Sequence, residues 1–461
     1  MSTTPAPAAP ALQRQLSSRY IQFIALGGAI GSGLFYGSAA TIGVAGPAVL
    51  IGYTLGGALM FLIMRALGEM ATAEPEAGSF SVYAHRYIGP FAGFAVGWTY
   101  WFSWIVVDMA ELAVLGIYMT YWFPHLPPWV SALTALALIL GVNLTSVRSF
   151  GATEFWFALV KVLAILALMV FGAVILALHL GDHAHVSNLW QDGGFLATGV
   201  TGVLLALPLI MFSFGGTELI GITAGEADDP ESTIPKAVNQ VIVRILIFYV
   251  GALLFILMLV PWRSIGLGAS PFVVAFQDVG VPAAAGILNF VVVTAALSAF
   301  NSGLFSTGRM LLTLAENRQA PHVFTTISSR GHVPYVGILC SSAVLGFGVL
   351  LDYLLPHQAF IYLAAIATVA LVSTWTMILV TQWRFRTAHN ATGTNTTLRF
   401  PMLAWPYSSY AGGAGMALVI IMMGFRADTR LALYLTPVWF GGLALGYRLM
   451  SKQAHATQIS P

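Results

Sequence analysis

Long apolar stretches, separated by short polar or Pro- and Gly-rich breaks, fill the chain from near Tyr20 to near Met450. A helix needs roughly 20 apolar residues to cross the hydrocarbon core of a bilayer, which is about 30 Å thick. The pattern therefore predicts an all-α integral membrane protein with twelve transmembrane helices. The predicted helices lie near residues 21–41, 47–70, 91–121, 129–146, 153–178, 197–224, 237–260, 283–313, 335–351, 358–383, 404–424 and 431–449.

A single membrane domain is expected over residues 20–450. It lies between an N-terminal tail of residues 1–19 and a C-terminal tail of residues 451–461. The first residues are rich in Ala, Pro and Thr, and they lack the basic, apolar and cleavage regions of a removed signal peptide. The first helix is therefore expected to remain as a span.

Basic residues are unevenly distributed between the two sides of the predicted membrane. If the N-terminus is cytoplasmic, most Lys and Arg residues fall in inner loops and helix ends, and Lys161 lies inside a span. The outer side then has only Arg263, Arg426 and Arg430. By the positive-inside rule, we expect a multi-pass protein of the cytoplasmic (inner) membrane with both tails in the cytoplasm.

Composition excludes several other classes of protein. Only 8% of the residues are charged and the mean hydropathy is +0.84, too apolar for a soluble surface of this size. The net charge of +2 gives no reason to expect a nucleic-acid partner. Cys340 is the only cysteine, so an intramolecular disulfide and a cysteine metal cluster are excluded. The sequence contains no phosphate-binding loop of the pattern GxxxxGK[ST], which argues against ATP-driven transport. We expect no metal, no cofactor and no obligatory protein partner.

Two of the predicted spans are interrupted by small residues. The first contains the run Gly27 to Gly33, and the sixth contains Phe212 to Thr217 with two adjacent glycines. Close helix packing would explain either one alone. The pair, one opening each five-helix half, is typical of inverted-repeat transporters that bind substrate at the bilayer midplane. Freed N–H groups suit a carboxylate and freed carbonyls suit an ammonium, and a zwitterionic amino acid presents both groups.

Four sequence motifs are similar to those of a known transporter family. They are Gly28 to Phe35, Ser213 to Glu218, Gly225 to Pro230 and Asn301 to Leu311. In this order on one twelve-span chain, they resemble the bacterial amino acid transporter (amino acid permease) family of the amino acid, polyamine and organocation (APC) superfamily. The resemblance implies a fold of the leucine-transporter type, with broken helices 1 and 6. Two inverted halves would cover about 20–180 and 197–385, followed by helices 11 and 12 at about 404–450.

The same resemblance implies a substrate site. The Ser32 and Gly33 N–H groups would bind the substrate carboxylate. The substrate ammonium would face backbone carbonyls, those of Ala29, Phe212 and Gly215. Phe212 or Phe214 would act as an aromatic lid, although plain packing is the common role of an aromatic residue in a membrane helix.

Ionisable residues inside spans are costly and therefore candidates for function. The sequence presents Asp108, Glu111, Lys161 and Glu218. Lys161 could extend its ammonium to the inner surface. By the resemblance it would instead take the place of a cation between the first, fifth and eighth helices. Its contacts there would be the Gly27 and Ile30 carbonyls and a hydroxyl such as that of Ser298. Loss of its proton would then release those helices, which favours proton coupling.

The acidic residues have two interpretations each. Asp108 and Glu111 are three residues apart and share a helix face, and two such close carboxyls disfavour simultaneous ionisation. Glu111 is either a proton-binding group or a hydrogen-bonded structural carboxyl. Asp108, on the helix face expected to line the substrate cavity, is a candidate for recognising the substrate side chain. Glu218 resembles a family acid involved in coupling and gating, and a structural role remains open.

The function predicted from these observations is import of amino acids by proton symport with alternating access. The expected partners are an amino acid, protons and membrane lipid. An ion channel should show a repeated filter, and an enzyme should show a nucleophile with a positioned base; the sequence shows neither, so we do not expect an enzyme. Exchange of one amino acid for another is the rival mechanism. The motifs favour small neutral, proline-like or aromatic substrates, and Asp108 leaves histidine or another cationic side chain open.

Overall fold

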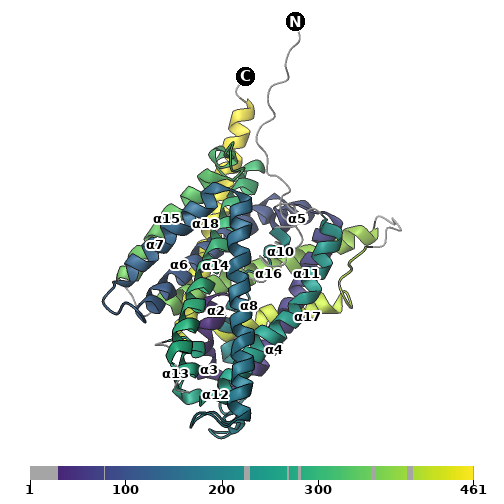
Figure 1. The fold of residues 1–461 in the computed structure, drawn as a ribbon. Coiled ribbons are helices and arrows are strands. Elements are labelled where there is room, and N and C mark those ends of the chain that lie inside the picture. The colour runs from purple at the N-terminus through teal and green to yellow at the C-terminus, as the bar shows by residue number, and fades with distance from the viewer. Residues whose placement is uncertain are drawn as a thin grey trace.

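The computed structural model describes residues 30–76, 78–222, 229–266, 269–278, 282–354, 359–391 and 398–459. Over these ranges the chain forms helices joined by turns (Figure 1). The α-helices are α2 (Ser32–Phe35), α3 (Gly37–Ala45), α4 (Val49–Ala73), α5 (Ser79–Tyr87), α6 (Pro90–Met119), α7 (Pro128–Thr145), α8 (Val147–Ala177), α9 (Gly199–Phe212), α10 (Leu219–Ile222), α11 (Pro230–Arg244), α12 (Ala252–Leu259), α13 (Pro271–Asp278), α14 (Pro282–Glu316), α15 (Tyr335–Leu354), α16 (Ala359–Ala391), α17 (Tyr407–Met423) and α18 (Ala427–Ile459). A π-helical segment, η4 (Ile245–Gly251), joins α11 to α12.

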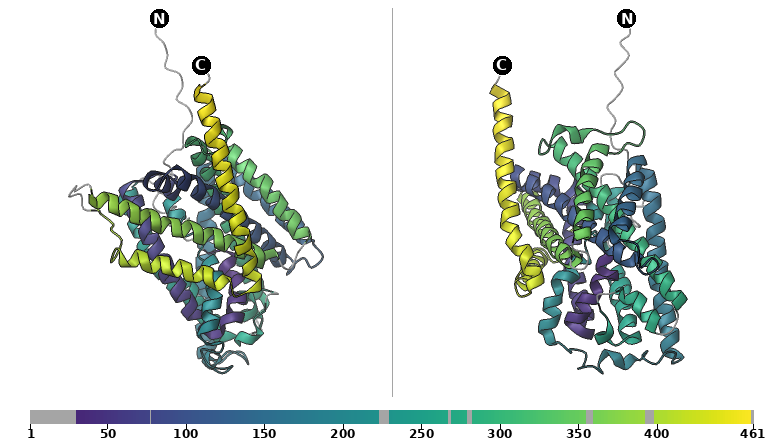
Figure 2. Two further views of the ribbon diagram at one scale, coloured as in Figure 1. Left: turned by 180° about the vertical axis from the view of Figure 1, so that it is seen from behind. Right: turned by 90° about the vertical axis from the view of Figure 1, so that its left-hand side faces the viewer.

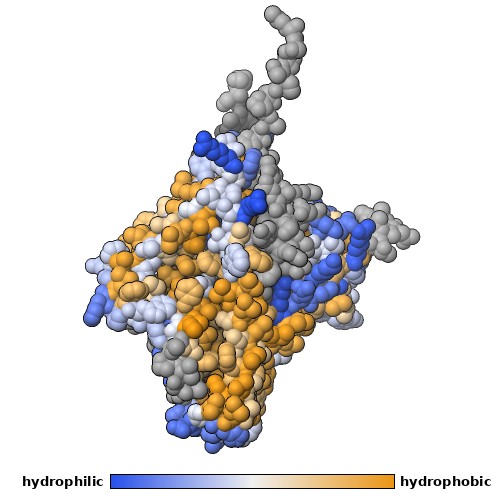
Figure 3. All heavy atoms as spheres, viewed as in Figure 1, coloured by the Kyte–Doolittle hydropathy of each residue, from blue (hydrophilic) through white to orange (hydrophobic). Residues whose placement is uncertain are grey.

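The described chain is a multi-span membrane protein. Seven of its helices are long and apolar enough to cross a membrane, and α17 with α18, which meet at a bend of 113°, can be counted as an eighth. On the face shown in Figure 3, hydrophobic residues gather over the middle of the molecule and hydrophilic residues at its lower tip. Such an apolar belt is the surface expected to face lipid.

Helix α8 shows how one span divides between lipid and protein. Trp156, Leu163 and Val170, spaced by seven residues, are all more than half exposed. Glu154 and Lys161, also seven apart but on the other side of the helix, are fully buried. Because seven residues make about two helical turns, each set forms one stripe. The apolar stripe faces outward and the charged stripe faces the bundle.

Each of the twelve predicted stretches contains a described helix, but several boundaries differ. The short helices α5 and α13 were not predicted. Helix α8 begins at Val147 rather than near residue 153, because the Ser146 side chain accepts a hydrogen bond from Ser149 N (3.0 Å) and caps the helix. Helix α18 continues to Ile459, into the predicted C-terminal tail, where neither Gly nor Pro interrupts it before Pro461.

The arrangement places two long helices at the centre. Helices α6 and α14 pack along each other, and α8 and α16 pack against them. The end of α18 and helix α5 lie at one end of the molecule, and α12 and α13 lie at the opposite end (Figures 1 and 2). The short helices α2 and α3 stand inside the bundle, where α2 contacts α6, α9 and α14. The described part of the first predicted span is therefore surrounded by other helices.

A buried ion pair ties α4 to α16. The carboxylate of Glu69 is fully buried and pairs with Arg386, and the Gln382 amide also donates to it. Removing one partner of a buried pair leaves an uncompensated charge and costs about 3–5 kcal/mol.

We expect Arg386→Leu to destabilise the protein by about 3 kcal/mol, because Glu69 would stay buried without its cation. The measurement is thermal stability of the detergent-purified protein. Arg399→Leu is the control, since Arg399 pairs with Glu231 at the surface and such pairs contribute about 0–1 kcal/mol. Equal losses of thermal stability in the two variants would show that the Glu69–Arg386 pair contributes no more to stability than a surface pair does.

Candidate functional site

The break predicted in the first span falls at Ile30 and Gly31, where the described residues begin, and backbone groups on both sides of Gly31 meet buried charged side chains. Gly31 has an extended conformation, and α2 begins at Ser32. Ser32 N donates to the Glu111 carboxylate at 3.0 and 3.3 Å, and the Ser32 hydroxyl donates to the same group at 2.8 Å. On the other side of the break, Lys161 Nζ donates to the Ile30 carbonyl at 2.9 Å. A carboxylate and an ammonium of the protein thus occupy the two sides of one break.

Lys161 does not reach the membrane surface. Its side chain is fully buried, and its Nζ also donates to Ser298 Oγ at 2.8 Å. Ile30 and Ser298 are two of the three contacts implied by the resemblance; the third, Gly27, lies outside the described residues. The ammonium therefore joins α8 to the first span and to α14, and the alternative of a surface-directed lysine does not describe this structure.

A second charged residue in this network, Glu154, was not predicted from the sequence. Its carboxylate is fully buried and accepts hydrogen bonds from the Ser298 hydroxyl and from Asn301 Nδ2 (3.2 Å). It was missed because α8 was predicted to start near residue 153, which put Glu154 at a helix end. The seven-residue spacing to Lys161 was the available signal, since it places both side chains on one face of a continuous helix.

The sixth span is interrupted between two described helices. Helix α9 ends at Phe212 and α10 begins at Leu219. Between them, Gly216 N donates to both carboxylate oxygens of Glu218 at 3.2 Å. Trp375 on α16 also donates to Glu218, at 3.2 Å. The fully buried Glu218 thus caps the break and connects it to α16.

The carbonyl side of the sixth break is satisfied by a tyrosine. Tyr249, in the π-helical segment η4, donates its hydroxyl to the Ser213 carbonyl at 3.0 Å. Segments of π-helix are common at functional sites, because they shift a side chain relative to a regular helix. Here the shift brings a phenol to a backbone group that the break exposes.

The two breaks touch each other at Gly33. A Cβ at this position would lie 2.6 Å from Ser213 Cα, so only glycine allows α2 to approach the end of α9 this closely. Any larger residue at Gly33 would displace backbone, whatever its effect on a ligand. Substitution of Gly33 therefore cannot by itself test the binding of a substrate carboxylate.

The two candidate lid residues lie in different surroundings. Phe214 packs with Tyr249 and Tyr53, with ring centroids 4.9 and 6.0 Å apart. Phe212 meets Phe360 edge to face at 5.9 Å. Gly215 lies against Leu371 of α16. Ala29 and the motif residues Gly225 to Asp228 lie outside the described residues.

Asp108 is fully buried and faces Gly303 of α14. Among the described residues, neither of its carboxyl oxygens has a hydrogen-bond partner. Unsatisfied buried polar groups are rare and call for a ligand, a water or a functional reason. The Asp108 carboxyl, between α6 and α14, is such a group among the described residues.

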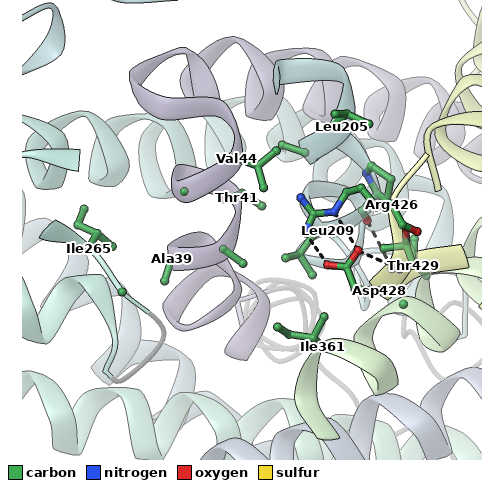
Figure 4. A pocket seen from close by; sticks show the side chains of 17 residues that line it. Ala39, Thr41, Val44, Leu205, Leu209, Ile265, Ile361, Arg426, Asp428 and Thr429 are labelled. Atoms are coloured by element: carbon green, nitrogen blue, oxygen red, sulfur yellow. Dashed lines mark hydrogen bonds and ion pairs between the residues drawn. The ribbon is translucent and has the colours of Figure 1, made fainter. Parts of the chain in front are cut away.

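A separate cavity of about 250 Å³ lies next to α3 and α9 (Figure 4). Apolar side chains such as Val44, Leu205 and Leu209 line it, and Arg426 and Asp428 form an ion pair at its edge. None of the predicted site residues that the structure describes lines this cavity. The charged residues at the breaks are therefore not exposed to it in this conformation.

Comparison with known proteins identifies the class of this chain. The model of the family described as "Amino acid permease" matches residues 20–459. The chain belongs to the amino acid permease family. It is 48% identical over 448 residues to the aromatic amino acid transport protein AroP of Escherichia coli (strain K12), covering 97% of each chain. It is 47% identical over 432 residues to the uncharacterized amino acid permease YtnA of Bacillus subtilis (strain 168), covering 93% of each.

Membership confirms the resemblance and makes the chain an amino acid permease of the APC superfamily, a transporter rather than an enzyme. Family membership also relates the buried polar groups of this permease to parts of the fold. The breaks, the charged side chains that cap them and the unsatisfied carboxyl of Asp108 lie on helices that the family resemblance associates with substrate or with the coupling cation.

In this permease, Gly303→Ala should reduce both stability and uptake, because the new Cβ would fall on the Asp108 carboxyl. Overpacking of this kind costs about 1–3 kcal/mol. The double variant Asp108→Ala, Gly303→Ala should recover stability, since the smaller side chain makes room. Thermal stability and labelled amino acid uptake are the measurements. Failure of the double variant to regain stability would mean that the two residues do not oppose each other.

Proposed function

We propose that this permease imports amino acids across the cytoplasmic membrane by proton symport with alternating access. The proposal includes the finer architecture expected from the sequence, twelve spans with the first ten in two inverted halves. The architecture is supported by the helix found in each of the twelve predicted stretches and by the breaks at Gly31 and between α9 and α10. Inverted repeats with paired broken helices bind substrate where the breaks meet.

Substrate binding in this proposal uses the backbone groups of the breaks. The Ser32 and Gly33 amides take the substrate carboxylate, and carbonyls of Ala29, Phe212 and Gly215 take its ammonium. Glu111 must then give up its bonds to Ser32, because both carboxylates need the same N–H group. Glu111 thus holds the site in the absence of substrate, and substrate binding releases α6 from the first span.

Lys161 carries the proposed coupling to protons. The observation that supports this most strongly is its pair of contacts, one to the Ile30 carbonyl and one to Ser298. A buried ammonium joins three elements there, and loss of its proton removes the charge that holds them. A group with two charge states between elements that move apart can bias a conformational equilibrium. Glu218 couples the sixth break to α16 in the same cycle, through Trp375.

Aromatic amino acids are the proposed substrates. The relative AroP is named for their transport. Phe212 is the better candidate for the lid, because it lies with Phe360 and Tyr36 in a row of rings, whereas Phe214 is enclosed in a separate cluster. Asp108 could accept a hydrogen bond from a side-chain N–H, such as that of an indole or imidazole.

The test is uptake into proteoliposomes with imposed gradients. We expect the native protein to accumulate a labelled aromatic amino acid when an inward proton gradient is present, with or without sodium. Lys161→Ala should still exchange substrate but lose about tenfold or more of the gradient-driven accumulation. Arg399→Leu serves as a control for a lost surface cation. Strict sodium dependence of the native protein, or full accumulation by Lys161→Ala, would refute the lysine mechanism.

Orientation is tested separately by cysteine labelling. In a Cys340→Ser background, cysteines replace the exposed Asp182, after α8, and the exposed Ser329, between α14 and α15. With both termini in the cytoplasm, a membrane-impermeant maleimide should label Asp182→Cys in intact cells and Ser329→Cys only after the cells are opened. The reverse pattern would invert the proposed topology.

A further inference from the structure

The row of groups that begins at Lys161 has a fixed direction of hydrogen bonding. An ammonium can only donate, so the Ser298 hydroxyl accepts from Lys161 Nζ. Ser298 has a single proton of its own, and it donates this proton to Glu154. The result is a continuous chain from the ammonium through one hydroxyl to a carboxylate, with all three residues fully buried.

The second oxygen of Glu154 is also occupied by a donor. Asn301 turns its Nδ2 toward Glu154 because its Oδ1 accepts from Asn143 Nδ2 on α7, at 2.9 Å. Glu154 therefore accepts hydrogen bonds at both oxygens, which is the pattern of an ionised carboxylate. In this conformation the row holds an ammonium at one end and an empty proton acceptor at the other.

We propose that Glu154 is the acceptor of the Lys161 proton, reached through Ser298, and that it is the first station on the route of that proton to the cytoplasm. In the transfer, an N–H bond of Lys161 breaks as an O–H bond forms at Ser298. The original Ser298 O–H bond breaks as one forms at Glu154. An ammonium and a carboxylate become an amine and a carboxylic acid, with no change in net charge.

The position of Glu154 agrees with this direction. It lies seven residues before Lys161 on α8, about 10 Å along the helix axis toward the Val147 end. That end lies with the basic loops that the charge distribution assigns to the cytoplasm. A proton that passes from Lys161 to Glu154 therefore moves inward, as import by symport requires.

The charged surroundings of Glu154 are few. On its own helix the facing group is Lys161. On α14 the neutral Ser298 and Asn301 donate to it and the neutral Ser302 also lies within reach, whereas the cation Arg309 lies farther along, over the Phe305 ring. By sequence, α7 and α12 have no titratable side chain, and η4 has only Tyr249. From α6, the charge of Glu111 acts on Lys161. Lys161 and Glu154 thus form a pair that can exchange a proton locally.

The experiment compares Glu154→Gln with the native protein in proteoliposomes. The amide still accepts from Ser298 but cannot take a proton. We expect amino acid exchange to persist and accumulation driven by a proton gradient to fall by about tenfold or more. Glu231→Gln is the matched control, since it makes the same change at an exposed pair and should leave both activities unchanged. Accumulation by Glu154→Gln at the native level would overturn the relay.

Ser298 supplies a second test if Glu154→Gln also loses exchange. Ser298→Thr keeps the hydroxyl and should accumulate substrate, whereas Ser298→Ala removes it and should not. Equal accumulation by these two variants would overturn the relay. The inference rests on the proposed symport, and the assays separate the two. If the native protein does not accumulate substrate in response to a proton gradient, symport is refuted. If both the native protein and Glu154→Gln accumulate substrate in response to the gradient, only the role of Glu154 is refuted.

Discussion

Backbone groups exposed inside a membrane domain must find partners within the protein, because no bulk water is present to bind them. Such groups occur at Ile30 to Ser32, where the first predicted break falls, and between α9 and α10, and four of them are met by a side chain from another element or from the break itself. The pairs are Ser32 N–H with Glu111, the Ile30 carbonyl with Lys161, Gly216 N–H with Glu218, and the Ser213 carbonyl with Tyr249. Three of the four partners are carboxylate or ammonium groups. These three buried charges are therefore held in place by the breaks that they cap.

Close packing makes this arrangement possible and also makes it sensitive. Gly33 lets the first break touch the second, and Gly303 lets α14 approach the carboxyl of Asp108. At both positions a single added methyl group would push apart elements that carry functional groups. The same contacts mean that a small movement of α2 or α14 alters several hydrogen bonds together. Packed elements of this kind tend to shift between discrete arrangements rather than deform gradually.

Much of this architecture follows from sequence pattern, and the parts that do not have identifiable physical reasons. The breaks were visible as small residues, and the contacts of Lys161 followed from a resemblance. Glu154 was missed because the Ser146 cap starts α8 earlier than the hydropathy suggests. The burial of Asp108 against Gly303 depends on how α6 and α14 are rotated about their axes. That rotation is set by packing across the whole interface, so no local pattern in either helix reveals it.

The caps also bear on the choice between symport and exchange. A symporter must return empty, whereas a strict exchanger returns only with substrate bound. A substrate site with unpaired amides and carbonyls would have a high free energy in an environment without water. That free-energy cost would favour a return step that takes place only with substrate bound. The first break is capped by the carboxylate of Glu111 and the ammonium of Lys161, the same two charged groups that an amino acid presents. If this break is the proposed substrate site, these two side chains can satisfy it during the return step, and under the proposed mechanism this agrees better with symport than with strict exchange.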